Sequence, residues 1–111
     1  MLRSLGKVTV TVSGTPIRLT NAEGDPTVRY PAHSFLVEAL STNTGALYVG
    51  TRTMDKTSLA GVFAIIPPPL TNSFPSFSTT VTYAPAAFNL ADIWLDAAVS
   101  GEGALVSCVQ A

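Results

Sequence analysis

Apolar and polar residues alternate strictly near the start of the chain. Residues 7–12 read Lys-Val-Thr-Val-Thr-Val, with a β-branched residue at every position after the lysine. Because successive side chains of a strand point to opposite faces, this alternation predicts a β-strand. Its buried face is expected to carry Val8, Val10 and Val12. The Ser-Gly-Thr-Pro at 13–16 predicts a turn, so residues 17–20 are expected to pair with 7–12 as a first hairpin.

Two more pairs of apolar segments flank turn-forming residues. Residues 34–40 and 46–51 lie on either side of Thr-Asn-Thr-Gly, and residues 93–99 and 104–109 lie on either side of Ser-Gly-Glu-Gly. Asn and Gly favour the positive φ angles that tight turns need. The sequence therefore predicts a second and a third hairpin.

Two further strands are predicted between these hairpins. Residues 62–66, Val-Phe-Ala-Ile-Ile, are apolar at every position, which is typical of a strand in the centre of a sandwich or with one face against another subunit. The prolines at 67–69 cannot donate to a sheet ladder and favour an extended arm. Residues 76–83 alternate again, and residues 84–92 predict a connection with one helical turn.

Short strands separated by Gly and Pro define the expected fold class. About eight of them predict an all-β fold, either an antiparallel β-sandwich or a jelly roll. The 111 residues of the chain fit one domain. We assign residues 7–111 to this domain. Residues 1–6 have few polar groups and too little length for an element, so we expect them to form an N-terminal arm against a neighbouring subunit.

The chain carries little charge. Only 12% of its residues are charged, 47% are hydrophobic and the formal net charge is -1. Such a surface is expected to be partly buried against partners. Without a basic excess, direct binding to nucleic acid is not expected. No stretch approaches the roughly 20 apolar residues of a membrane span, and no apolar run of a secretory signal opens the chain, which favours synthesis in the cytoplasm.

Residues that usually carry chemistry are scarce. The chain has one histidine, His33, and one cysteine, Cys108. Neither has a partner in the sequence that would suggest a disulfide, a metal site or a Cys-His pair, so both are expected to be structural. Phosphate-binding loops, Rossmann glycine patterns and Gly-x-Ser-x-Gly elbows are absent from the sequence. We predict no enzymatic activity and no cofactor or metal.

Three polar constellations have a functional and a structural interpretation. Asp92 and Asp96 straddle Trp94 at the period of a strand, which suggests a sugar-binding surface or, as we favour, a solvated face with one aromatic at an interface. Oxygen-bearing side chains alternate at Asn21, Glu23 and Asp25, but the distal bidentate Glu of a helix-loop-helix calcium site is missing. Three arginines are expected at strand edges or in loops, where they pair with carboxylates of other subunits: Arg18, Arg29 and Arg52.

Two segments resemble small virion proteins of tailed bacteriophages. Residues 88–96 and 99–106 contain Leu-Ala-Asp-Ile-Trp followed by a glycine turn and a last apolar strand, and they resemble the C-terminal hairpin of those proteins. Residues 43–50, Asn-Thr-Gly-Ala-Leu-Tyr-Val-Gly, are similar to a second hairpin that recurs in them. The resemblance implies a β-sandwich structural subunit of the virion, often trimeric, and it supplies no catalytic residues.

The expected function follows from this resemblance and from the apolar, charge-poor composition. We expect a capsid decoration or cement protein that stabilises the head, made in the bacterial cytoplasm and located in the virion. Its expected partners are further copies of itself, as a homo-oligomer and in particular a trimer, and the major capsid protein or other virion proteins. The alternatives are a tail, fibre or head-to-tail subunit and a carbohydrate-binding module. The expected interface residues are Phe63, Ile65, Pro67, Pro68, Pro69 and Trp94.

Overall fold

The computed structural model describes residues 2–22, 28–68, 78–82 and 88–110. These residues form nine strands, one more than expected, and two short 3-10 turns, Leu19–Ala22 and Leu90–Asp92. The strands are β1 (Leu2–Thr9), β2 (Ile17–Arg18), β3 (Pro31–Ala39), β4 (Leu47–Gly50), β5 (Val62–Ile66), β6 (Ser78–Thr82), β7 (Phe88–Asn89), β8 (Trp94–Ala97) and β9 (Gly103–Gln110).

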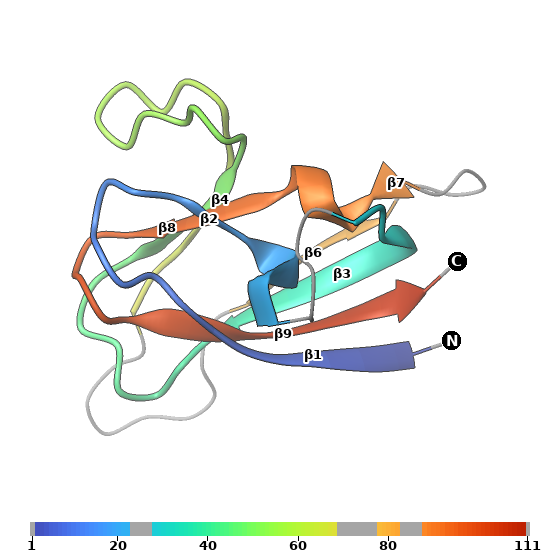
Figure 1. Cartoon of the computed structure of the whole chain (residues 1–111). Helices are drawn as coiled ribbons and strands as arrows, with labels where there is room; N and C mark the ends of the chain where they lie inside the picture. The colour runs from blue at the N-terminus through green and yellow to red at the C-terminus, as the bar shows by residue number, and fades with distance from the viewer. Residues whose placement is uncertain (1, 23–27, 69–77, 83–87, 111) are drawn as a thin grey trace.

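The strands form two antiparallel sheets that pack face to face (Figure 1). Sheet A has the order β1-β9-β3-β6, with β7 also paired to β3, and sheet B has the order β2-β8-β4-β5. The predicted all-β antiparallel sandwich is therefore confirmed. The N- and C-termini lie at the same end, because β1 and β9 are neighbours in sheet A.

The core lies between the sheets and is built by alternate residues of each strand. Sheet A contributes Phe35, Val37 and Val106, and sheet B contributes Leu47, Val49 and Leu95, all of them fully buried. This alternation follows from the two-residue period of a strand, which places the intervening residues on the outer faces.

The first strand starts earlier than the sequence predicted. Residues 2–6 do not form a separate arm, because they are the first part of β1 and pair with β9, where Leu2 lies opposite Val109. The register shifts between Ser4 and Gly6, where Gly6 has a φ of 80°, and this bulge places Leu5 in the core. An arm over 1–6 was expected because six residues are too short for an element of their own, but residues 2–6 are part of a strand of eight residues.

The end of β1 also differs from the prediction. Val8 and Val10 are buried as expected, whereas Val12 is 54% exposed. The strand ends at Thr9 and the chain turns at Gly14, whose φ is 91°. Val12 therefore lies in the connection between two strands and has left the core face.

All three predicted hairpins are wrong as pairings, although their turns are correctly placed. In each pair the first and second strands belong to different sheets: β1 and β2, β3 and β4, and β8 and β9. The connections at 10–16, 40–46 and 98–102 therefore carry the chain across the core from one sheet to the other (Figure 1). Turn-forming residues predict that the chain changes direction. They do not predict whether the two flanking strands pair within one sheet or lie in two facing sheets.

The three connections are held together at one end of the sandwich. The buried Asn43 donates from Nδ2 to the carbonyl oxygen of Gly103 at 2.8 Å. The Glu102 carboxylate accepts hydrogen bonds from the N–H of Thr44 at 2.6 Å and of Gly45 at 2.9 Å. The N–H of Val10 donates to the carbonyl oxygen of Glu102 at 2.9 Å. These bonds satisfy polar groups that would otherwise be left unpaired where the chain leaves the sheets.

The apolar strand at 62–66 is confirmed with its predicted bounds as β5. It lies at the edge of sheet B and not in the centre of a sheet. It is the last strand of sheet B and pairs with β4. Ile66 is buried, whereas Phe63 is 53% and Ile65 46% exposed. The strand expected at 76–83 is present as β6, and the helical turn expected within 84–92 is the 3-10 turn at Leu90–Asp92.

Candidate functional site

The outer face of sheet B carries aromatic and basic side chains that lie close together. Its members follow from the register, in which Tyr48 lies opposite both Asp96 and Ile65, while the neighbours Leu47 and Leu95 point into the core. Arg18 lies opposite Trp94 on the same face. We define this docking face by six residues that lie on or beside this surface: Arg18, Tyr48, Arg52, Phe63, Ile65 and Trp94.

A bulge at the start of β5 turns Phe63 toward solvent. Val49 pairs with Ala64 and Gly50 pairs with Val62, so Phe63 is the extra residue in β5. The backbone comes close here, because a Cβ on Gly50 would lie 2.2 Å from the carbonyl oxygen of Gly61. Only glycine permits this approach. Gly50 thus allows the two backbones to come close beside the bulge at Phe63. The sequence predictions did not identify this glycine.

Trp94 lies beside two guanidinium groups. The Cζ of Arg18 is 4.7 Å and the Cζ of Arg52 is 5.8 Å from the centroid of its ring. Both distances are within cation-π range. Arg18 is fixed by a hydrogen bond from Nη1 to the carbonyl oxygen of Ala91 at 2.7 Å. The structure therefore brings Arg18 and Arg52, two of the three arginines named from the sequence, onto the half-buried indole of Trp94.

Neither of these arginines forms an ion pair with a described residue. Among the described residues, no carboxylate lies within salt-bridge distance of Arg18 or Arg52. The docking face therefore combines the exposed apolar side chains of Phe63 and Ile65 with two cationic groups, Arg18 and Arg52.

Asp96 does not join Trp94 in a sugar-binding arrangement. The residue is only 1% exposed, and its Oδ1 accepts a hydrogen bond from the N–H of Gly14 at 3.0 Å. Its Oδ2 lies 3.5 Å from the Nζ of Lys56. Asp92 is exposed at the end of the 3-10 turn. The carboxylate of Asp96 is therefore engaged by Lys56 and Gly14 and not by Trp94. The solvated face that we favoured is wrong for Asp96, because this residue is buried.

Lys56 anchors the long connection between β4 and β5. Its Nζ donates to the Oγ of Ser13 at 2.7 Å and to the carbonyl oxygen of Ala97 at 3.0 Å, in addition to its ion pair with Asp96. The connection starts at Thr51 and ends at Gly61, whose carbonyl accepts the N–H of Thr51 at 2.8 Å. Sequence reasoning missed this lysine because a single cation in a polar loop gives no signal of its long-range partners.

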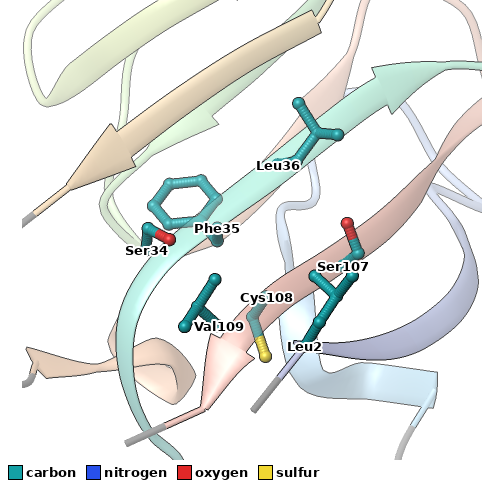
Figure 2. A pocket seen from close by; sticks show the side chains of 7 residues that line it. All are labelled: Leu2, Ser34, Phe35, Leu36, Ser107, Cys108 and Val109. Carbon is teal, nitrogen blue, oxygen red and sulfur yellow. The ribbon is translucent and has the colours of Figure 1, made fainter.

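The outer face of sheet A has an open apolar pocket of about 230 Å³ (Figure 2). Leu2, Leu36 and Val109 line it, together with the hydroxyl-bearing Ser34 and Ser107. The remaining lining residues, Phe35 and Cys108, are buried. An acid, a base or a second metal ligand is missing from this lining, so the pocket offers no arrangement for acid-base or metal chemistry.

The other residues named from the sequence do not gather into a site. Cys108 is buried within β9, as expected for a structural thiol, and His33 lies in β3 at the register shift between Ala32 and Ser34. Asn21 lies in the first 3-10 turn, whereas Glu23 and Asp25 are outside the described residues, as is Pro69. Pro67 is exposed and Pro68 half-buried after β5. Arg29 is exposed.

The described part of the chain contains no group of three or more His, Cys, Asp and Glu side chains that could hold a metal ion. It also contains no helix that is long and apolar enough to span a membrane.

Comparisons of the chain with protein-family models, with curated proteins and with solved structures found no match.

Proposed function

We propose that this protein is a structural subunit of a bacteriophage virion that binds its neighbours through the docking face of sheet B. The observation that carries the proposal is the exposure of Phe63 and Ile65 beside Tyr48 and the Arg-flanked Trp94. Tryptophan, tyrosine and arginine are the residues that contribute most binding energy in protein interfaces. A face that concentrates them on a rigid sheet is suited to binding proteins.

The virion assignment rests on the resemblance of residues 43–50, 88–96 and 99–106 to small phage virion proteins. A β-sandwich without a catalytic constellation in its described residues agrees with a structural role. Within the virion we favour a decoration or cement protein that binds the major capsid protein and stabilises the head. A cement protein gains avidity by spreading weak contacts over several neighbours.

The position in the particle is tested by copy number and by removal. Quantitative mass spectrometry of purified particles is expected to find hundreds of copies per particle on an icosahedral head. Six, twelve or a few dozen copies would favour the alternative, a tail, fibre or head-to-tail subunit. Particles stripped of the protein are expected to lose thermal and osmotic resistance, and unchanged resistance would exclude cementing.

The docking face is tested separately from the virion assignment. Phe63→Ser and Trp94→Ala are each expected to weaken rebinding of the purified protein to stripped particles. The first removes an exposed aromatic side chain, and the second removes the half-buried indole beside the two arginines. Leu105→Ser is the matched control, because Leu105 is 48% exposed on the opposite sheet. Equal rebinding of all three variants would exclude this face as the contact.

A carbohydrate-binding module has less support. Aromatic side chains stack on sugars, but the carboxylate that would accompany Trp94 is occupied by Lys56 and Gly14. Glycan-array binding that is lost in a folded Trp94→Ala variant would favour this function over the structural one.

A further inference from the structure

The last strand of sheet B has one side without a partner among the described residues. β5 pairs with β4 and with no other described strand. The outer side of such an edge strand presents backbone N–H and C=O groups that can pair with another strand. Folded proteins usually protect these edges with charged side chains, bulges or very short strands.

The other sheet edges carry such protection. β1 carries Lys7 and the bulge at Gly6, and β2 has only two residues, one of which is Arg18. The segment of β6, Ser-Thr-Thr-Val-Thr, is mostly polar. By contrast, β5 reads Val-Phe-Ala-Ile-Ile and contains no polar or charged side chain. β5 has a bulge of its own at Phe63 and is followed by Pro67, so the feature that distinguishes this edge is its wholly apolar sequence.

We propose that β5 pairs with β5 of a second copy of this chain. The two strands run antiparallel around a two-fold axis that passes beside Ala64, so the two four-stranded B sheets join into one continuous sheet. A two-fold contact uses the same surface of both copies and closes on itself, which leaves no free edge at β5.

The register of this pairing brings the most exposed side chains of β5 together. With Ala64 opposite Ala64 of the second copy, Phe63 lies opposite Ile65 of the second copy on the outer face, and the reverse pair forms on the other side of the axis. Phe63 is 53% and Ile65 46% exposed in the single chain. Aromatic and β-branched side chains form favourable cross-strand pairs. Two such pairs cover the apolar part of the edge.

Charge favours β5 over β1 and β2 as the edge at which two copies of the chain pair. A two-fold contact at β1 would gather Arg3 and Lys7 of both copies, and one at β2 would gather two copies of Arg18. Like charges across neighbouring strands are destabilising. Because β5 carries no charge, the same symmetry at this edge brings only apolar side chains together.

The two-fold contact predicts a dimer in place of the trimer expected from the sequence. It does not rest on the virion assignment. The contact shares Phe63 and Ile65 with the docking face, whereas Trp94 lies in β8, which β4 separates from β5. The arginine-flanked part of the docking face therefore remains free for a different partner in the dimer.

Sedimentation of the full-length protein at tens of micromolar tests the association. The unmodified chain is expected to sediment as a dimer. Ile65→Lys places a charge in the contact and is expected to raise the dimer dissociation constant more than about tenfold. The control is Leu105→Lys, since Leu105 is 48% exposed in β9, which already has a strand on each side. It is expected to stay dimeric, and circular dichroism verifies that both variants fold.

A cysteine substitution tests the register. Strands place directly opposite Cα atoms about 4.5–5.5 Å apart, which is within the range of a disulfide. Oxidised Ala64→Cys is therefore expected to form a covalent dimer on a non-reducing gel. Val109→Cys, exposed on sheet A, is expected to remain uncrosslinked at the same concentration. A monomer or a trimer in sedimentation, or equal crosslinking of the two cysteine variants, would overturn the proposed pairing.

Discussion

Lys56 and Asp96 form an ion pair across the outer face of sheet B, with 3.5 Å between Nζ and Oδ2. The pair is asymmetric, because the side chain of Asp96 is 2% and that of Lys56 24% exposed. The carboxylate belongs to β8 and is buried, whereas the ammonium belongs to the connection between β4 and β5 and covers the carboxylate from outside. One residue of a polar loop thereby determines where the loop lies beside the docking face.

Removing the buried carboxylate is predicted to destabilise the fold. Asp96→Ala leaves the N–H groups of Gly14 and Ala97 without this acceptor and removes the ion-pair partner of Lys56, so we expect a loss of about 2–3 kcal/mol in the free energy of unfolding. Asp96→Asn retains an acceptor for Gly14 and is expected to lose about half as much. Urea denaturation measures both variants. Equal stability of Asp96→Ala and the unmodified protein would show that the pair contributes nothing.

Glu102 is predicted to make stability depend on acid pH. Desolvation by burial works to raise its pKa, but the hydrogen bonds from the N–H groups of Gly45 and Thr44 and from the Thr44 hydroxyl outweigh it, so the pKa is lowered from 4.5. A carboxylate with a lowered pKa in the folded state stabilises the fold above the pKa of the unfolded chain. This stabilisation is lost as the pH falls below about 4.5 and through the folded-state pKa.

The matched variant for this effect is Glu102→Gln. It is expected to lower the free energy of unfolding at neutral pH by about 1 kcal/mol and to reduce the loss of stability on acidification. Asp55 is expected to leave a residual dependence, because hydrogen bonds from the N–H groups of Thr57 and Ser58 lower its pKa as well. Denaturation curves across the acid range measure this, and an unchanged slope with pH in Glu102→Gln would contradict the assignment.

Gly50 is predicted to be intolerant of any side chain. A Cβ at this position would lie 2.2 Å from the carbonyl oxygen of Gly61, a backbone atom that moves only if the bulge is lost. We expect Gly50→Ala to cost about 2 kcal/mol or more. Gly45→Ala is the control, since its Cβ would meet the Cγ2 of Val99 at 2.9 Å and that side chain can shift. Thermal unfolding compares them, and a smaller loss for Gly50→Ala than for Gly45→Ala would contradict this geometry.

The fluorescence of the single tryptophan can be used to probe the docking face in solution. Trp94 is the only tryptophan of the chain, so its fluorescence reports on this surface alone. Arg52→Ala removes one of the two guanidinium groups beside its ring, and we expect acrylamide to quench the emission more strongly. The exposed Arg29 supplies the control, Arg29→Ala. The same increase in both variants would mean that Arg52 does not cover the indole.

The sequence predicted the class of fold well because the period of apolar residues depends on the two faces of each strand. The alternation at 7–12 predicted the burial of Val8 and Val10, and the continuous apolar run at 62–66 predicted β5. The pairing of strands depends on partners far apart in the chain, and the sequence contains no local signal for it. The turn at 43–45 illustrates this. Asn43 was expected to form a hairpin turn, and it bonds instead to Gly103 across the end of the sandwich.

The sequence predicted the apolar residues of the candidate interface but not the arginines beside them. Phe63, Ile65 and Trp94 were identified because apolar residues on both sides of a strand must be covered by something. Their basic neighbours were assigned to strand edges and loops without any link to Trp94. Arg18 and Arg52 are 34 positions apart in the sequence, and only the order β2-β8-β4 brings both to one indole.

The most direct test of the proposed function is an electron-microscopy reconstruction of the phage particle that contains this protein. We expect density for a small β-sandwich on the capsid surface, with Trp94 and the arginines of the docking face buried against the major capsid protein. Absence of the protein from purified particles would contradict the account. A sandwich bound to the particle with this face entirely in solvent would contradict it as well.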